Sequence, residues 1–269
     1  MTRAFDLGPA LLFVPGDRPD RLAKALDRAD AAILDLEDAV APDAKAAARE
    51  ALVDADPDPD RLVVRVNAPG SEDFARDLAA LAETRVRRIM VAKAEDVASL
   101  SALSGYEVVV LCETARGVVA AEQLAAVPHV VALMWGAEDL VASLGGTASR
   151  RDDGTYRDVA RLARARVLLA AGAAGKAAID AVHVDIADVD GLAEEARDAA
   201  ASGFAATACI HPGQVETIRS AYAPSSAEVE WARAVLAAAE GEGGVFRFRG
   251  RMIDEPILRH ARRVRQRER

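Results

Sequence analysis

The 269-residue sequence has few cysteines, the residues that cross-link small domains through disulfides. It has two cysteines, Cys112 and Cys209, and each lies inside an apolar run. Free cysteine is among the most commonly buried residue types, so we expect two reduced thiols in the core. No spacing of cysteine and histidine matches a metal-binding pattern, and we therefore expect no structural zinc.

The sequence also lacks segments suited to a membrane or to export. No apolar run reaches the roughly 18 residues that a membrane-spanning helix needs. No basic stretch followed by a long apolar one is found near the N-terminus, so we see no signal peptide. The formal net charge of −9 disfavours an overall attraction to nucleic acid or to an anionic membrane. We predict a cytoplasmic protein with no nucleic-acid or membrane partner.

The sequence does contain a repeated pattern, a short apolar run followed by an alanine-rich amphipathic stretch. Eight runs have the composition of buried strands. They cover residues 10–14, 31–36, 62–66, 88–92, 108–112, 130–135, 181–186 and 206–210. Helical spacing of apolar residues is found at 21–28, 73–81, 97–103, 118–124, 156–174, 192–202 and 215–222.

Strands that alternate with helices predict parallel strands joined by right-handed crossovers. Eight such units in about 220 residues fit a (β/α)₈ TIM barrel better than an open sheet. An open doubly wound sheet is the alternative fold, but no G-x-G-x-x-G motif follows the first run. We predict a barrel domain over residues 1–223. Residues 224–269 form a C-terminal helical and hairpin extension, too small for its own core.

Two consecutive runs each end in a carboxylate close to a glycine. Glu113 follows the fifth run, and Asp139 follows Gly136 after the sixth. Barrel active sites form at the C-terminal ends of the strands, so both side chains would lie at one end of the sheet. Two hard oxygen ligands with open positions suit Mg²⁺. The alternative is that each carboxylate caps the helix that follows it.

Charged residues follow other runs too, among them Glu37, Asp38 and Lys93. Solvation of ordinary loops explains Lys93 adequately. Arg65 differs because valines flank it within the third run, and an inward-facing arginine needs an anionic partner. The connection over residues 142–154 is equally compatible with a substrate loop and with a solvated loop.

Seven segments occur in order along the chain: Leu12-Phe-Val-Pro-Gly-Asp-Arg18, Asp35-Leu-Glu-Asp-Ala-Val40, Arg65-Val-Asn67, Glu113-Thr-Ala-Arg-Gly117, Gly136-Ala-Glu-Asp-Leu140, Ile210-His-Pro212 and Gly250-Arg-Met-Ile-Asp254. Together they resemble the citrate lyase β-subunit-like proteins of the HpcH/HpaI aldolase superfamily, which also contains malyl-CoA and citramalyl-CoA lyases. One departure is Pro9-Ala10, where the family often has Arg-Ser, and it removes a possible anion contact.

The resemblance implies a (β/α)₈ barrel, trimeric or hexameric, that cleaves or forms a carbon–carbon bond beside a CoA thioester with Mg²⁺. It implies that Glu113 and Asp139 bind the metal, and that Glu113 also contacts the substrate. It implies that Arg65 holds the substrate's oxyanion or carboxylate. Glu37 and Asp38 would hydrogen-bond waters around the metal.

Asp254 matches the aspartate that acts as acid/base from a neighbouring subunit in CoA lyases of this family. From the residues alone, Asp254 is nearly as well explained as a helix N-cap ahead of Pro256. In a retro-Claisen cleavage Mg²⁺ chelates the hydroxyl and a carboxylate, and Arg65 stabilises the oxyanion. A carboxylate such as Asp254 shuttles the proton, and the extension then packs on a neighbouring subunit.

Three functions stay open at this point. The first is a Mg²⁺-dependent lyase for a short β-hydroxyacyl-CoA, such as malyl-, citramalyl- or 3-hydroxy-3-methylglutaryl-CoA. The second is a CoA-independent, pyruvate-forming class II aldolase, which would share the Glu/Asp metal site and not need Asp254. The third is the β component of a citrate lyase, which works only on an acyl group carried by a partner protein.

Overall fold

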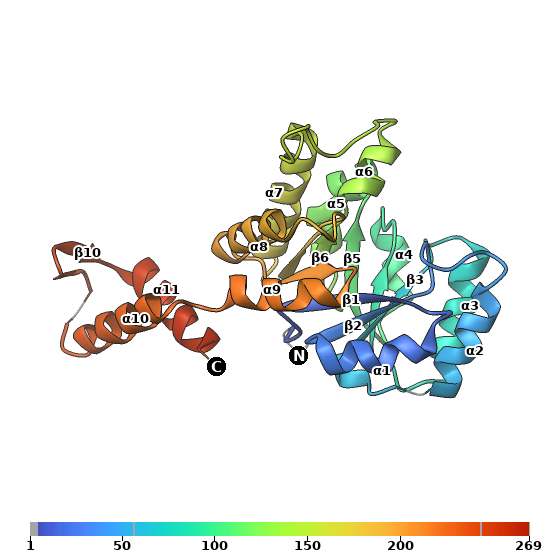
Figure 1. Ribbon diagram of the computed structural model, residues 1–269, viewed down its shortest axis with the longest axis horizontal. Coiled ribbons are helices and arrows are strands. Elements are labelled where there is room, and N and C mark those ends of the chain that lie inside the picture. Colours follow the sequence, from blue (N-terminus) through green and yellow to red (C-terminus); the bar gives the residue numbers. More distant parts are fainter. Residues whose placement is uncertain (1–4, 56, 243, 269) are drawn as a thin grey trace. The chain divides into compact units, whose positions relative to one another are not determined.

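The computed structural model describes residues 5–55, 57–242 and 244–268. The chain divides into two compact units, one up to Ile218 and one from Arg219 onward. In the first unit, eight parallel strands close into a barrel in sequence order, which confirms the predicted (β/α)₈ fold (Figure 1). The strands are β1 (Ala10–Pro15), β2 (Ala31–Asp35), β3 (Leu62–Val66), β4 (Arg88–Val91), β5 (Glu107–Cys112), β6 (Val130–Trp135), β7 (Ala177–Asp180) and β8 (Ala206–Cys209).

Helices connect the strands and lie outside them (Figure 1). They are α1 (Pro19–Arg28), α2 (Lys45–Ala55), η1 (Pro59–Arg61), α3 (Glu72–Leu81), α4 (Val97–Ser101), α5 (Ala115–Ala125), α6 (Ala137–Ser143), α7 (Asp158–Ala173), α8 (Val189–Ser202), η2 (Pro212–Gln214) and α9 (Val215–Tyr222). Within the described residues, no helix is both long enough and apolar enough to span a membrane.

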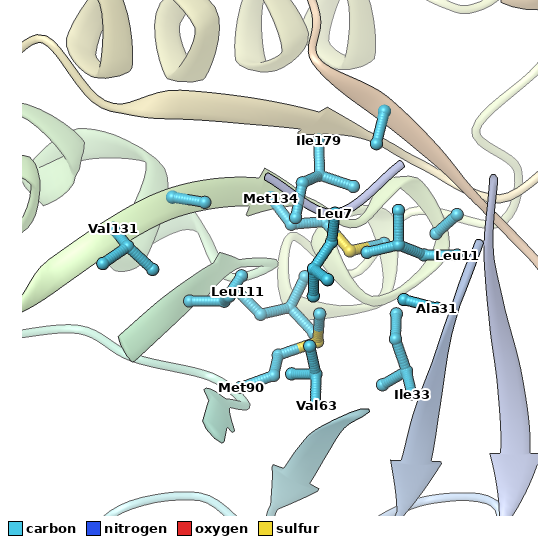
Figure 2. Packing of buried hydrophobic residues seen from close by; sticks show 14 residues of the cluster. Leu7, Leu11, Ala31, Ile33, Val63, Met90, Leu111, Val131, Met134 and Ile179 are labelled. Carbon is cyan, nitrogen blue, oxygen red and sulfur yellow. The ribbon is translucent and has the colours of Figure 1, made fainter. Parts of the chain in front are cut away.

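The barrel interior is packed with aliphatic and methionine side chains, including Leu11, Ile33, Val63, Met90 and Leu111 (Figure 2). Burying each large side chain contributes roughly 1.5–3 kcal/mol. Successive strand residues point to opposite faces, so a residue two positions beyond an interior one faces the interior again. This alternation decides which polar residues enter the barrel mouth.

The seventh strand is not where the sequence predicted it. The predicted run, residues 181–186, is a loop, and β7 lies just before it. Alternating Val182, Val184 and Ile186 imitate a half-buried strand, yet Val184 and Ile186 are 45% and 48% exposed. Strands of a parallel barrel are covered on both sides and read as continuous apolar runs, as Ala177-Ala-Ile179 does.

Helices α2 and α6 were also absent from the prediction. Both are short, and α2 is rich in alanine on all sides, which leaves little contrast between an apolar and a polar face. The carboxylates Glu138 and Asp139 lie in the first turn of α6. They therefore belong to a helix start rather than to the end of a strand.

The second unit contains α10 (Ser226–Ala239), the hairpin β9 (Phe246–Phe248) and β10 (Arg251–Ile253), and α11 (Glu255–Arg267). Arg249 and Gly250 both have positive φ, 46° and 81°, as a two-residue type I′ hairpin turn requires. An apolar cluster that includes Val235, Ile253 and Leu258 holds these elements together. The unit thus has a small core, so the prediction that it is too small for its own core is wrong.

Candidate active site

The strands β2, β3 and β5 bring Asp35, Arg65 and Glu113 to the same end of the barrel. Each of the three lies two residues beyond an interior side chain, namely Ile33, Val63 and Leu111. Strand alternation therefore directs all three toward the barrel interior. Asp35 and Arg65 are also direct neighbours in the pairing of β2 with β3.

Arg65 is held by two carboxylates of its own chain. Its Nε donates to Asp35 Oδ1 at 2.7 Å and its Nη2 donates to Asp35 Oδ2 at 2.5 Å, in a bidentate pair. Its Nη1 lies 3.2 Å from Glu37 Oε2, and its guanidinium lies over Phe13 at 5.1 Å. Burial alone would lower the pKa of Arg65, but Asp35, Glu37 and Glu113 raise it. The expected anionic partner is thus present within the chain.

Asp35 also organises the loop that follows β2. Its side chain is fully buried and accepts hydrogen bonds from the backbone N–H groups of Glu37 (2.9 Å) and Ala39 (3.0 Å). Asp35 lies within the segment Asp35-Leu-Glu-Asp-Ala-Val40, and no role was predicted for it. Its position in phase with Ile33, inside an apolar run, was the signal that it faces the interior.

Lys93 joins this cluster, so the interpretation of Lys93 as a merely solvated residue is wrong. Its Nζ pairs with Glu37 and with Asp38 Oδ2, the latter at 2.9 Å. Burial would lower the pKa of Lys93, but these two carboxylates raise it. Lys93 also has φ = 50°, a left-handed conformation that costs a non-glycine residue roughly 1–2 kcal/mol.

Glu37 and Asp38 differ in their surroundings. Glu37 is 4% exposed, and burial raises its pKa against the opposing charges of Arg65 and Lys93. Asp38 is exposed, and although partial burial acts in the opposite direction, the hydrogen bond from Lys93 and its charge lower the pKa of Asp38. Lys93 therefore fixes one buried and one accessible carboxylate in a single loop.

Glu113 lies just past β5 and is 2% exposed. Its Oε1 accepts a hydrogen bond from the Lys93 backbone N–H at 3.0 Å. Its Oε2 lies over Gly136, where an added Cβ would stand 3.2 Å from Oε2 and 2.9 Å from Glu113 Cβ. Burial raises the pKa of Glu113 to about 8, with Asp139 adding to the shift and Arg65 opposing it.

The helix-capping alternative is wrong for both Glu113 and Asp139. Thr114 caps α5, because its Oγ1 accepts from Gly117 N at 3.0 Å. Gly136 is the N-cap of α6, without a side-chain cap. Asp139 is half-buried in the first turn of α6, and its charge acts on Glu113 strongly enough to raise the pKa of Glu113. Because Gly136 at the start of α6 contacts Glu113, the structure places both carboxylates at the same end of the barrel.

The donor set suits a hard divalent cation. Within residues 5–55, 57–242 and 244–268, no three Asp, Glu, His or Cys side chains form a metal-binding group. A metal here would have two protein carboxylates and would take its remaining ligands from water or substrate, which is the habit of Mg²⁺. Burial raises the pKa of Glu113 against the charge of Arg65, so nearby positive charge would compensate this carboxylate only in part. A divalent cation beside Glu113 and Asp139 would supply the missing charge.

Asp254 lies in the second unit and is the N-cap of α11. Its Oδ1 accepts from Ile257 N at 3.3 Å, which confirms the capping interpretation of this residue. The role of Asp254 as an acid or base stays a prediction. Its side chain is half-buried, and Oδ1 is the oxygen that makes the cap.

Comparisons with known proteins agree with this geometry. Residues 10–212 match the HpcH/HpaI aldolase/citrate lyase family. A citrate lyase subunit beta-like protein of Mycobacterium tuberculosis (strain CDC 1551 / Oshkosh) is 57% identical over 254 residues, 94% of this chain and 93% of the relative. A mitochondrial citramalyl-CoA lyase of Homo sapiens is 33% identical over 287 residues, 94% of this chain and 83% of the relative.

A solved structure of the protein CitE from Mycobacterium tuberculosis, in complex with magnesium, acetoacetate and coenzyme A, has the same fold. Its TM-score is 0.93 at 55% identity, covering 97% of this chain and 98% of that one. The predicted family and the predicted lyase class are both confirmed. On its fold, its barrel-mouth residues and these matches, the chain belongs to the HpcH/HpaI aldolase/citrate lyase family.

Proposed function

We propose that the protein is a Mg²⁺-dependent carbon–carbon lyase that cleaves or forms a short β-hydroxyacyl-CoA thioester. The observation that carries this proposal is the Glu113 carboxylate, which is 2% exposed, accepts a hydrogen bond from Lys93 N and lies at the barrel end that also carries Arg65 and the first turn of α6 with Asp139. The magnesium, acetoacetate and coenzyme A in the related CitE structure support both the cofactor and the thioester. The name of the human relative, citramalyl-CoA lyase, supports the bond that is cleaved.

Glu113 and Asp139 would hold the metal. Mg²⁺ bound there supplies a Lewis acid that polarises the substrate's hydroxyl or keto oxygen. Glu37 and Asp38 would accept hydrogen bonds from the surrounding waters, and Lys93 fixes both of them for that task. Because Gly136 has no Cβ, Glu113 can lie directly over the start of α6, which carries Asp139.

Arg65 would bind the oxyanion that develops as the carbon–carbon bond breaks. Two of its five N–H groups donate to Asp35, and its Nη1 lies 3.2 Å from Glu37 Oε2. The remaining N–H groups would donate to a ligand at the mouth. Since Asp35 fixes the guanidinium in advance, Arg65 needs little rearrangement to stabilise charge in the transition state, where such stabilisation is most effective.

Cleavage requires a proton acceptor and a proton donor. A base removes the proton of the β-hydroxyl, whose oxygen becomes the carbonyl of one product as the carbon–carbon bond breaks. The electron pair of that bond forms the enolate of the acyl thioester, which then takes up a proton. We assign this proton shuttle to Asp254 of a neighbouring subunit, within a homotrimer or hexamer in which residues 224–269 pack on the neighbour.

The test is a panel of malyl-, citramalyl- and 3-hydroxy-3-methylglutaryl-CoA incubated with the full-length protein and Mg²⁺. Mass spectrometry would detect the released acetyl-CoA or other acyl-CoA. We expect one thioester to be cleaved by the wild type and not by Glu113→Gln or Asp254→Asn. Asparagine also caps helices, so Asp254→Asn removes the acid while α11 stays capped.

Two matched variants control for the loss of a carboxylate in general. Glu138→Gln changes the residue beside Asp139; Glu138 Oε1 accepts a hydrogen bond from Ser149 Oγ at 2.5 Å. Glu255→Gln changes the residue beside Asp254. Both should keep activity. Failure of every thioester, with Mg²⁺ bound and the fold intact, would favour the pyruvate-forming aldolase or the carrier-dependent citrate lyase component. Removing residues 245–269 should spare an aldolase and abolish a CoA lyase that depends on Asp254.

A further inference from the structure

We propose that Lys93 is a positioning residue of this site, which sets the orientation of Glu113 through its backbone and the place of Glu37 and Asp38 through its side chain. This inference rests on the proposed function, since it concerns the same metal site. It assigns to the turn after β4 a role that the motifs of the sequence did not suggest.

The backbone of Lys93 adopts a left-handed conformation that is uncommon for a residue other than glycine. Lys93 and Arg249 are the non-glycine residues with positive φ among the described part of the chain. Arg249 is explained by its hairpin turn. Glycine would suit the turn at position 93 better, so a lysine in this conformation indicates that its side chain is used.

The turn at Lys93 also fixes one oxygen of the Glu113 carboxylate. In this conformation the Lys93 N–H points at Glu113 and occupies Oε1 at 3.0 Å. A carboxylate held by one oxygen keeps a fixed rotation, and the other oxygen, Oε2, then lies on the side of Gly136 and α6. Because α6 carries Asp139, the hydrogen bond from Lys93 presents Oε2 where a shared cation would lie.

Helix α5 packs against the turn that contains Lys93. Gly117, in the first turns of α5, lies against Ala94, and a Cβ on Gly117 would stand 2.6 Å from the Ala94 carbonyl oxygen. Ala94 is fully buried. The helix that follows Glu113 therefore packs directly on the residue that follows Lys93, so the donor and acceptor of the hydrogen bond move together.

The side chain of Lys93 connects this turn to the loop after β2. The Lys93 ammonium pairs with Glu37 and Asp38, and Glu37 in turn lies 3.2 Å from Arg65 Nη1. Lys93 thus links the metal carboxylate after β5 to the loop after β2 and to the guanidinium on β3. One residue couples the groups that hold the cation to the group that holds the oxyanion.

The test compares Lys93→Met with Lys93→Arg and with the control Lys176→Met. Lys176, just before β7, contacts the Pro128 carbonyl oxygen at 3.3 Å, away from this cluster. Calorimetric titration measures the Mg²⁺ affinity of each full-length protein without substrate, and steady-state kinetics measure kcat and KM with the cleaved thioester. Thermal unfolding checks the fold. If Lys93→Met does not fold, Lys93→Gly replaces it, because glycine accepts the left-handed conformation.

We expect Lys93→Met to weaken Mg²⁺ binding and to lower kcat, each by about 10-fold, as is typical for residues that orient metal ligands. Lys93→Arg should recover most of both losses, and Lys176→Met should show neither. Removing a positive charge by itself strengthens cation binding, so a purely electrostatic Lys93 predicts tighter Mg²⁺ binding in Lys93→Met. Mg²⁺ binding as tight as in the wild type, or tighter, would overturn the proposal. The Mg²⁺ measurement decides this even if no thioester is cleaved.

Discussion

Glu113 and Asp180 are two carboxylates at comparable places in the barrel, and their surroundings differ sharply. Each lies at the end of a strand, β5 or β7, and they are 2% and 5% exposed. Asp180 accepts hydrogen bonds from Trp135 Nε1 (2.6 Å), from Arg164 Nη2 (2.8 Å) and from Ala181 N (3.1 Å). Glu113 accepts one from Lys93 N, and its carboxylate makes no ion pair within 4.0 Å among the described residues.

Burial alone therefore does not show whether the fold satisfies the charge of a carboxylate. A buried charge is stable where donors surround it, and it is costly where they do not. Asp180 has a full set of donors and ties α7 to β7 through Arg164. Glu113 keeps a raised pKa of about 8 because its compensation is incomplete, which is the condition expected of a ligand-binding group.

The region around Asp180 is a cleft of about 650 Å³ between α7 and α8. Several of its charges are paired with one another: Arg150 pairs with Glu195 and stacks on Tyr156 at 3.8 Å, and His183 contacts Glu195 at 2.9 Å. The cleft is thus rich in charge, and much of this charge is paired within it. We interpret these ion pairs as contacts that hold α7 and α8 together, and not as a second ligand-binding site.

The largest effect on stability should separate the two carboxylates. Asp180→Asn should lower the free energy of unfolding by about 3 kcal/mol, because it removes the buried charge that accepts from Trp135 and Arg164, and the half-buried Arg164 is left with Asp198 as its carboxylate partner. Glu113→Gln should leave the free energy of unfolding unchanged or raise it, since a neutral amide replaces an incompletely compensated charge. Urea unfolding of both variants at pH 7.5 measures this. Equal losses in the two variants would show that the carboxylates play the same structural part.

The next effect sharpens the comparison through the metal. Mg²⁺ at about 100 times its Kd should stabilise the wild-type protein by about 2.7 kcal/mol, because it binds the folded state alone. Glu113→Gln should lose this stabilisation, and Asp180→Asn should keep it despite its lower baseline. Melting curves with Mg²⁺ and with a chelator give the answer. An increase in Tm that persists in Glu113→Gln would place the cation elsewhere.

The smallest expected effect is the pH dependence of the stability that His183 contributes in the cleft between α7 and α8. The hydrogen bond to Glu195 and the charge of Asp188 raise the pKa of His183, against burial and the charge of Arg150. A histidine whose folded pKa is raised stabilises the fold fully below its unfolded pKa of about 6.5 and loses this contribution as pH rises through the folded value. His183→Gln should therefore cost about 1 kcal/mol at pH 5.5 and less at pH 8.5.

Unfolding in urea at the two pH values measures the pH dependence. Glu195→Gln provides the control, because the main cause of the shift is then absent and the added His183→Gln change should have a smaller pH dependence. A loss from His183→Gln that grows as pH rises would contradict the assigned charge state.

The sequence predicted the barrel well because its strands are apolar runs that differ clearly from the helices between them. It failed at β7, where an exposed loop alternates like a strand, and at α2, where alanine hides the helical period. The places of Glu113, Arg65 and Glu37 at the barrel mouth could be predicted because each lies at or next to the end of such a run. The contacts of Lys93 could not, because they depend on a left-handed turn and on Glu37, which is 56 residues away.

By itself the sequence determined the strand order, the end of the barrel at which carboxylates gather, and the family to which the chain belongs. These follow from local periodicity and from motifs a few residues long. Only the tertiary structure decided which charges are satisfied, because the partners of Glu113, Asp180 and Lys93 come from other strands and helices. Whether a buried carboxylate stabilises the fold or awaits a ligand depends on those distant donors, which no local pattern records.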